Sequence, residues 1–178
     1  MLLALYMIAW PLLPGFSWWV KHDVVKAKPP TTKALVVAHT SSNGPPQQNT
    51  LVIPALNLYE QIHEGKTIAA ANHGVWRLPM TSTPDRGSNT VIVGHRFTYA
   101  GLAVFYNLDK LKQADQITIY WGKTPYLYQI SSIKVVDPSD TSIERPSDKK
   151  ILTLYTCTPL WSTKNRLVIQ ANFIGNKV

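Results

Sequence analysis

The chain contains a single cysteine, Cys157, which directly follows the apolar, β-prone stretch ILTLYT. A free thiol has a pKa near about 8.5, so a histidine that shares its proton makes the sulfur a better nucleophile. His95 could be that base, because it follows a glycine at the end of a second β-prone stretch, NTVIVGH. Arg166 opens a third such stretch, and its guanidinium could bind the oxyanion that forms when a thiolate attacks an amide. Cys157, His95 and Arg166 are therefore candidate catalytic residues for acyl transfer.

Each of these residues also has an ordinary structural interpretation. A lone cysteine is often a small buried hydrophobe, and an arginine can extend its charge to solvent. The remaining histidines do not follow a comparable β-prone stretch, which leaves His95 as the strongest candidate base; they are His22, His39, His63 and His73. No cluster of cysteine and histidine has the spacing of zinc ligands, so the sequence predicts no metal site.

Neighbouring strands must position the three candidate residues. Apolar and β-branched runs between turn sequences predict strands at 50–58 (ended by Pro54), 89–95, 116–121, 126–136, 151–156 and 166–173. The last two should form a hairpin around a loop from Cys157 to Asn165, which would bring Cys157 and Arg166 within cross-strand distance. Because most of these strands follow one another through hairpins, we expect an antiparallel arrangement, either a closed barrel or a sandwich.

One segment has a different spacing of apolar residues. Phe105, Leu108 and Leu111 recur at intervals of three within residues 102–115. This spacing predicts a short amphipathic helix. The polar, proline-bearing residues 137–150 predict a loop.

The N-terminal residues differ in composition from the rest of the chain. Residues 1–20 carry no charged side chain, end near Trp18 and Trp19, and as a helix would rise about 30 Å. They predict a membrane anchor, with a cleaved signal peptide or a buried helix as alternatives. Residues 21–50 are polar and rich in proline and predict an extended linker, which leaves 51–178 as the compact domain.

The formal net charge is +8, from 18 basic and 10 acidic residues. Such a charge favours anionic surroundings, but no nucleic-acid-binding motif is present. The sequence therefore predicts no nucleic-acid partner, and its charge indicates a protein that functions near a membrane or an acidic wall polymer. With one cysteine, the chain can form no internal disulfide.

Several ordered motifs resemble those of the sortases, the cysteine transpeptidases of Gram-positive-type cell surfaces. The TLxTC signature is present as TLYTC, which ends at Cys157, and the histidine motif is present as VIVGHR. The arginine motif follows as RLVIQA. The segments GVWRLPMTSTPDRGSN and FYNLDKLKQADQITIYW also resemble the family before and after its histidine. The resemblance extends over roughly residues 50–174.

The resemblance implies a mainly β fold, a closed eight-stranded barrel with one or two short helices, preceded by the N-terminal anchor helix. It implies that Cys157 is the nucleophile, that His95 is the general acid and base, and that Arg166 holds the substrate and the oxyanion. Thr156 matches the signature threonine and would help line the substrate site. Trp161 would shape the substrate groove.

The resemblance further implies the reaction and its partners. An LPxTG-like sorting-signal peptide would be cleaved through a thioester on the cysteine, and an amine of a cell-wall precursor or a pilin lysine would accept the acyl group. No cofactor is expected, and no acidic cluster for calcium is found in the sequence. The enzyme would be held in the cell membrane by its single N-terminal span, with the catalytic domain extracellular.

Two other functions fit the same residues. The chain could be another cell-wall cysteine transpeptidase or peptidase, such as an L,D-transpeptidase. It could also be a membrane-tethered β-barrel binding module whose cysteine is buried and not catalytic.

Overall fold

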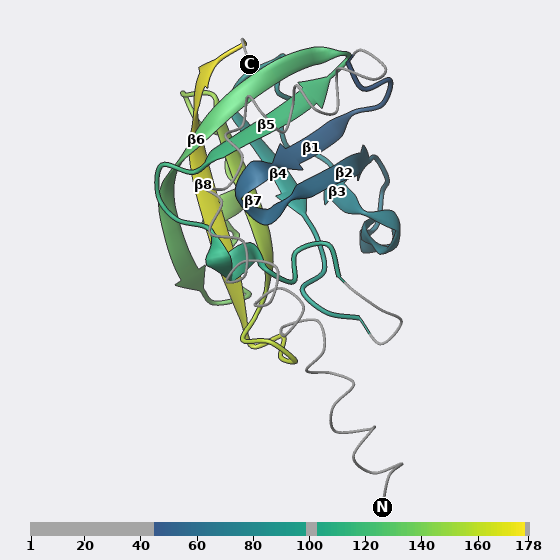
Figure 1. Ribbon diagram of the computed structural model, residues 1–178. Coiled ribbons are helices and arrows are strands. Elements are labelled where there is room, and N and C mark those ends of the chain that lie inside the picture. Colours follow the sequence, from purple (N-terminus) through teal and green to yellow (C-terminus); the bar gives the residue numbers. More distant parts are fainter. Residues whose placement is uncertain (1–44, 99–102, 177–178) are drawn as a thin grey trace, which may run out of the picture.

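Eight strands form a closed barrel in the computed structural model, which describes residues 45–98 and 103–176 (Figure 1). The strands neighbour one another in the order β1-β2-β3-β4-β7-β8-β6-β5, and β5 pairs with β1 to close the barrel. Their bounds are β1 Thr50–Ile53, β2 Leu58–His63, β3 Val75–Arg77, β4 Asn89–Val93, β5 Gln116–Trp121, β6 Thr124–Val136, β7 Ile151–Thr158 and β8 Asn165–Gly175. The barrel that the family resemblance implied is confirmed.

The hairpin of β5 and β6 follows directly from its turn sequence. Trp121 pairs with Thr124, so only Gly122 and Lys123 connect the strands. Both have positive φ, 54° and 72°, as expected for the two-residue turns that match the twist of paired strands. The predicted strands 116–121 and 126–136 are confirmed as partners in this hairpin.

Six of the eight strand pairs are antiparallel, as expected, but β2 pairs in parallel with β3 and β4 pairs in parallel with β7. In the second pair, Asn89 lies opposite Ile151 and Val93 opposite Tyr155. The chain can arrange β4 and β7 in this way because β5, β6 and their connections lie between them in the sequence. A hairpin rule applied only to successive strands therefore misses these two pairings.

The helix expected over residues 102–115 is also wrong. Residues 103–115 form successive turns, with one 3-10 turn, η4, at Leu108–Lys110. Phe105, Leu108 and Leu111 are nevertheless buried in the core. Their three-residue spacing matches the three residues per turn of a 3-10 helix. The apolar pattern therefore marks buried residues correctly, but its period indicates 3-10 turns and not an α-helix.

Every helix within residues 45–98 and 103–176 is a short 3-10 segment. Besides η4, these are η2 Pro54–Leu56, η3 Ile68–His73 and η5 Thr141–Glu144. Over the same two ranges, no helix is long and apolar enough to cross a membrane. The predicted anchor, 1–20, and residues 21–44 of the predicted linker lie outside the described residues.

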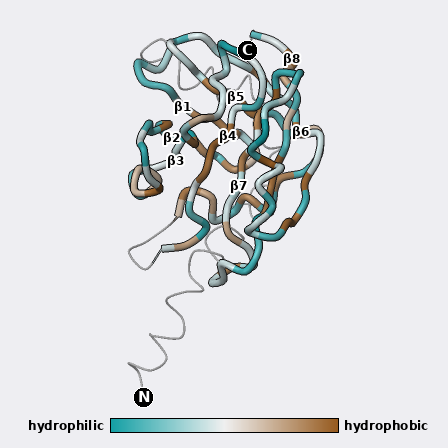
Figure 2. Tube along the Cα trace, turned by 180° about the vertical axis from the view of Figure 1, so that it is seen from behind, coloured by the Kyte–Doolittle hydropathy of each residue, from teal (hydrophilic) through white to brown (hydrophobic). Residues whose placement is uncertain are grey.

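Hydrophobic residues fill the barrel and also cover part of its outside. Figure 2 shows them concentrated along the strands, whereas the connecting segments are mainly hydrophilic. The interior contains fully buried side chains of every long strand, among them Leu51, Ile117, Tyr128, Leu154 and Ile169. A second, smaller cluster lies on the outer face of β3, β4 and β7, and consists of Ala71, Trp76, Val91 and Val93 with Tyr155 packed against them.

A buried asparagine joins the β6–β7 connection to this part of the sheet. Asn89 is 3% exposed, and its Nδ2 donates to the carbonyl oxygens of Ile143 and Arg145 at 2.9 and 3.0 Å. Its Oδ1 accepts from the hydroxyl of Thr153 at 2.9 Å. One side chain thus holds β4, β7 and the loop 137–150 together.

Replacing Asn89 with alanine should destabilise the fold by about 2 kcal/mol, because buried carbonyls and a hydroxyl lose their partners. Urea unfolding would measure the loss. Asn176→Ala is the matched control, since the Asn176 side chain makes one exposed hydrogen bond, to the carbonyl of Pro125. Equal stability of the Asn89 and Asn176 variants would contradict the structural role given to Asn89.

Candidate active site

Cys157 and Arg166 lie directly opposite each other in the ladder of β7 and β8. The two strands extend further than the sequence predicted, to Thr158 and from Asn165, so both residues belong to the ladder and the connecting loop is shorter than 157–165. Directly opposite residues project to the same face, with Cβ atoms about 4.5–5.5 Å apart. The hairpin therefore places the thiol and the guanidinium side by side.

The alternation along β7 sends the Cys157 side chain to the outside of the barrel. Leu152 and Leu154 belong to the interior cluster, whereas Tyr155 packs on the outer one. Because successive side chains in a strand point to opposite faces, Cys157 shares the outer face with Tyr155. The thiol is partly buried and free of any disulfide.

His95 follows β4, the other neighbour of β7. Val93 pairs with Tyr155 in parallel, and two residues further along each chain come His95 and Cys157. The ladder continues past Val93, because the amide of Gly94 donates to the carbonyl of Tyr155 at 3.4 Å. Neighbouring strands are about 4.8 Å apart, so Cys157 lies between Arg166 on β8 and His95, which follows the end of β4.

The His95 ring has one polar partner from another segment. Its Nε2 lies 3.1 Å from Oδ1 of Asn72, in η3. A carboxamide oxygen only accepts, so this contact is a hydrogen bond in the ring forms that carry a proton on Nε2. Asn72 could not be predicted from the sequence, because nothing in the local pattern links residue 72 to residue 95.

The guanidinium of Arg166 is fixed by backbone oxygens at the base of the β7–β8 loop. Its Nη1 donates to the carbonyls of Thr163 at 2.9 Å and Asn165 at 3.2 Å. The pKa of the nearby Asp137 carboxyl is lowered, mainly because the hydroxyl and amide of Ser139 donate to it, with the charge of Arg166 as a smaller cause. Arg166 thus keeps further donors for a ligand beside Cys157.

The two residues predicted to contact substrate have different surroundings. Thr156 is 1% exposed, and its hydroxyl donates to the carbonyl of Gly94 at 2.8 Å, so it ties β7 to the end of β4. Trp161 is 51% exposed in the β7–β8 loop, and its ring centroid lies 5.2 Å from that of Phe97. Phe97, which the sequence did not single out, therefore joins Trp161 in an aromatic pair close to the ends of β4 and β7.

Tyr155 connects the outer face to the β6–β7 connection. Its hydroxyl donates to Oε1 of Glu144, in η5, at 2.8 Å. Burial, followed by the hydrogen bond to Glu144, raises the pKa of Tyr155 well above its usual value. The phenol consequently remains protonated at physiological pH and keeps donating to the carboxylate.

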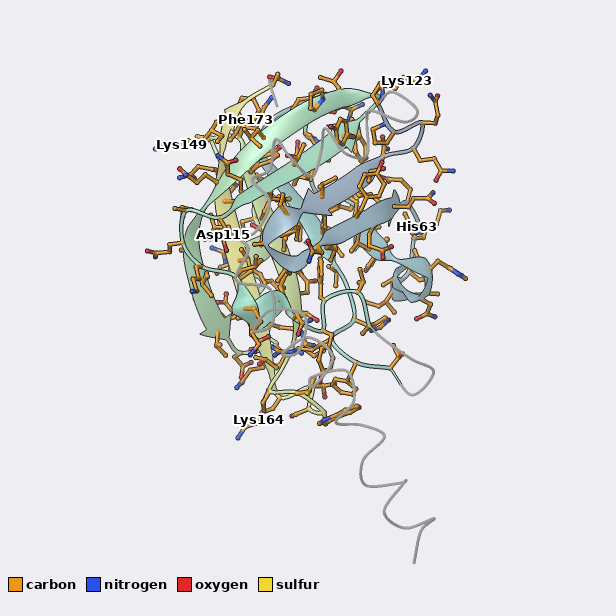
Figure 3. All side chains as sticks on the ribbon, in the orientation of Figure 1. His63, Asp115, Lys123, Lys149, Lys164 and Phe173 are labelled. Atoms are coloured by element: carbon orange, nitrogen blue, oxygen red, sulfur yellow. The ribbon has the colours of Figure 1, made fainter. Side chains whose placement is uncertain are left out.

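The site lies toward the end of the barrel where the β7–β8 loop is located. In Figure 3 this end is marked by Lys164, and the opposite end by Lys123 of the β5–β6 turn. Figure 3 also labels His63, on the side of the molecule near η3, and its Nε2 lies 3.0 Å from the carbonyl of His73. Of the other histidines, His22 and His39 lie outside the described residues.

No group of three or more histidine, cysteine, aspartate or glutamate side chains within residues 45–98 and 103–176 could hold a metal ion. The expectation that the protein uses neither a metal nor another cofactor stays a prediction.

Comparison with known proteins gives one consistent result. Residues 51–174 match the family model of the sortase domain. Sortase D of Bacillus subtilis is 33% identical over 110 residues, which cover 61% of this chain and 53% of that protein. Putative sortase YwpE of Bacillus subtilis is 29% identical over 88 residues, covering 49% of this chain and 85% of that protein. The chain thus spans about half the length of Sortase D.

Solved structures agree with the sequence matches. A Clostridium perfringens Sortase D5 transpeptidase has a TM-score of 0.65 and 30% identity, with 72% of this chain and 79% of that chain covered. Sortase C1 of GBS Pilus Island 1 has a TM-score of 0.66 and 27% identity, with coverages of 72% and 66%. Sortase A from Corynebacterium diphtheriae has a TM-score of 0.66 and 25% identity, with coverages of 85% and 73%.

Gly94, next to His95, has no room for a side chain. A Cβ there would lie 2.7 Å from Cδ2 of Phe105 and 2.8 Å from Cγ1 of Val104. Gly94→Ala should therefore destabilise the protein by about 1–3 kcal/mol through overpacking, as measured by chemical denaturation. Adding Phe105→Leu should relieve the clash, so that Gly94→Ala costs less in that background than in the original one. An equal cost in both backgrounds would contradict the close approach.

Proposed function

The chain belongs to the sortase family of cysteine transpeptidases, and we propose that it cleaves an LPxTG-like sorting signal and transfers the acyl fragment to an amine. The observation that supports this proposal is that Cys157 pairs with Arg166 across β7 and β8 and lies beside the end of β4, which His95 follows. We infer that the Cys157 thiol, the His95 imidazole and the Arg166 guanidinium border one substrate site on the outside of the barrel, as nucleophile, proton carrier and cation. Attack on a peptide carbonyl requires these three functions together.

In the first half-reaction, the Cys157 thiolate attacks the carbonyl carbon of the threonine in the sorting signal. The C–S bond forms, and the carbonyl oxygen becomes an oxyanion that the Arg166 guanidinium stabilises. The tetrahedral intermediate then collapses and the C–N bond to the next residue breaks. Protonated His95 gives its proton to the departing amine, and a thioester remains on Cys157.

In the second half-reaction, an acceptor amine attacks the thioester carbonyl. His95, now neutral, takes a proton from the attacking nitrogen as the new amide bond forms. Collapse of the second tetrahedral intermediate breaks the C–S bond and returns the thiolate. Each proton and electron pair moved in the first half-reaction is thereby restored, and no cofactor takes part.

The other named residues support binding of the peptide. Thr156 holds Gly94 and so fixes the backbone beside His95. Trp161 and Phe97 offer an exposed aromatic surface that suits the apolar and proline side chains at the start of an LPxTG-like signal. We assign these aromatic rings to the substrate groove.

The partners and the location follow from the family and the N-terminal sequence. The acceptor is an amine of a cell-wall precursor or a pilin lysine, and the second choice is supported by the similarity to Sortase C1 of GBS Pilus Island 1 and to a pilus-related Sortase C of Group B Streptococcus. The uncharged residues 1–20 would anchor the protein in the cell membrane, with the catalytic domain outside the cell.

The protein incubated with a small library of sorting peptides and amines should form a covalent adduct on Cys157, detected by intact-mass spectrometry. The adduct should have the mass of the peptide cleaved after threonine, and an amine should release it as a new peptide product. Cys157→Ala should form no adduct. Peptide binding with no adduct in the unmodified protein would favour a binding module, and an adduct in Cys157→Ala would remove Cys157 from the chemistry.

Arg166→Lys should lower kcat/KM for transpeptidation at least about 30-fold, because lysine keeps the charge but loses the planar set of donors. The thermal midpoint should change little, since Arg166 bonds only to loop carbonyls at a partly exposed site. Lys164→Arg, which alters a neighbouring exposed cation, serves as the control. Near-normal turnover of Arg166→Lys would exclude Arg166 from oxyanion binding and leave the role of Cys157 intact.

A further inference from the structure

Arg96, the residue after His95, is a buried cation. It is 7% exposed, and its Nη2 lies 3.0 Å from Oδ2 of Asp109. Its Nη1 donates to the hydroxyl of Thr158, the residue after Cys157, at 3.3 Å. Thr158 is the last residue of β7, and because side chains alternate along a strand it points to the side opposite Cys157. The Arg96 guanidinium therefore contacts β7 on the face opposite the proposed nucleophile.

This contact is one of two side-chain links between the same pair of backbone segments. The hydroxyl of Thr156, before Cys157, donates to the carbonyl of Gly94, before His95. Arg96, after His95, donates to Thr158, after Cys157. The two links thus bracket Cys157 on β7 and His95 beyond β4. The last residue pair of β4 and β7 is Val93 with Tyr155, and one backbone hydrogen bond follows it, from Gly94 to Tyr155. The two side-chain links therefore lie at the end of the backbone ladder.

The acidic partner of Arg96 is itself held by the core. Asp109 belongs to η4, whose Leu108 is fully buried, as is the preceding Phe105. The amide of Phe105 also donates to the carbonyl of His95 at 3.0 Å. The segment that supplies the carboxylate therefore contacts both the backbone of His95 and the side chain of Arg96.

We propose that the Arg96–Asp109 ion pair is a positioning device that sets the distance between His95 and Cys157 through Thr158. This inference rests on the proposed transpeptidase function for its meaning. Only the Arg96 side of the pair is buried, since the Asp109 side chain is 38% exposed, and an ion pair open to solvent adds little stability. The Nε of Arg96 also has no hydrogen-bond partner within the described chain. The rigid fork of the guanidinium instead fixes geometry, joining Asp109 and Thr158 at a set angle.

The test compares steady-state transpeptidation by Arg96→Met, Arg96→Lys, Asp109→Asn and Thr158→Val. Displacement of about 1 Å at a reacting group can cost 10²-fold in rate, so Arg96→Met should lower kcat about 100-fold while KM stays within threefold. Thr158→Val removes only the hydroxyl and should lower kcat about fivefold. Arg96→Lys should recover part of the loss, because it restores a charge that Asp109 can pair.

Arg77→Met is the matched control. Arg77 is also a largely buried arginine, paired with Glu64 at 2.6 Å, but it lies on β3 and has no contact with Thr158. Its kcat should remain within twofold of the original protein. The double variant Arg96→Met with Asp109→Asn removes both charges, so it should regain thermal stability relative to Arg96→Met but not kcat.

Recovery of stability and kcat together in the double variant would overturn the inference, because the pair would then serve only the fold. A folded Arg96→Met with kcat within threefold of the original protein would also overturn it. If Arg96→Met does not fold, Thr158→Val decides, and an unchanged kcat in that variant is the overturning result.

A peptide-free measurement separates this inference from the proposed function. The rate of Cys157 alkylation by iodoacetamide at pH 7 depends on the neighbouring imidazole but needs no sorting signal. Arg96→Met should slow alkylation at least threefold, and adding His95→Ala should slow it no further. An unchanged rate in Arg96→Met overturns the positioning role. Absence of any acyl-enzyme in the original protein instead overturns the proposed function.

Discussion

The parallel pairing of β4 with β7 is the constraint on which the site depends. It aligns two segments that are separated by more than fifty residues, so that the residue two beyond Val93 stands beside the residue two beyond Tyr155. The antiparallel pairing of β7 with β8 then adds Arg166 on the other side of Cys157. A shift of either register by one residue would send an entire row of side chains to the wrong face, and the apolar cores on both faces oppose such a shift.

Polar side chains join segments of the chain that strand pairing does not connect. Asn89 ties the β6–β7 connection to β4 and β7, and Tyr155 ties the same connection to the outer face through Glu144. Beyond the end of β4, side-chain hydrogen bonds of Thr156 and Arg96 connect the chain to β7 in place of main-chain hydrogen bonds. Buried polar groups are costly unless they are paired, so their concentration along β4 and β7 marks this region as one where fixed geometry matters more than maximal stability.

The sequence predicted those parts of the fold that depend on local pattern. The strands around residues 89–95, 116–121, 126–136, 151–156 and 166–173 and the tight turn at Gly122 follow from composition and periodicity over a few residues. Strand β2 was missed because its sequence, LYEQIH, neither alternates regularly nor forms an apolar run, and β3 was missed because three residues carry too little periodic signal. The β4–β7 pair was missed because pairing between distant segments leaves no mark in the local pattern, and the β2–β3 pair was missed because neither strand was predicted. For the same reason Cys157, His95 and Arg166 could be named as candidates, whereas Asn72, Phe97 and the partners of Arg96 emerged only from the three-dimensional arrangement.

In the proposed function, the nucleophile Cys157 is held within a strand, whereas Trp161, which is proposed to contact the peptide, lies in the adjacent loop. A sulfur carried by a strand that is paired on both sides cannot follow a loop as that loop adapts to a ligand. Conformational adaptation then falls to the connection between β7 and β8, where Trp161 has the positive φ of 65° that few side chains adopt. The β7–β8 connection can therefore change in length or sequence while the backbone that carries Cys157 keeps its position.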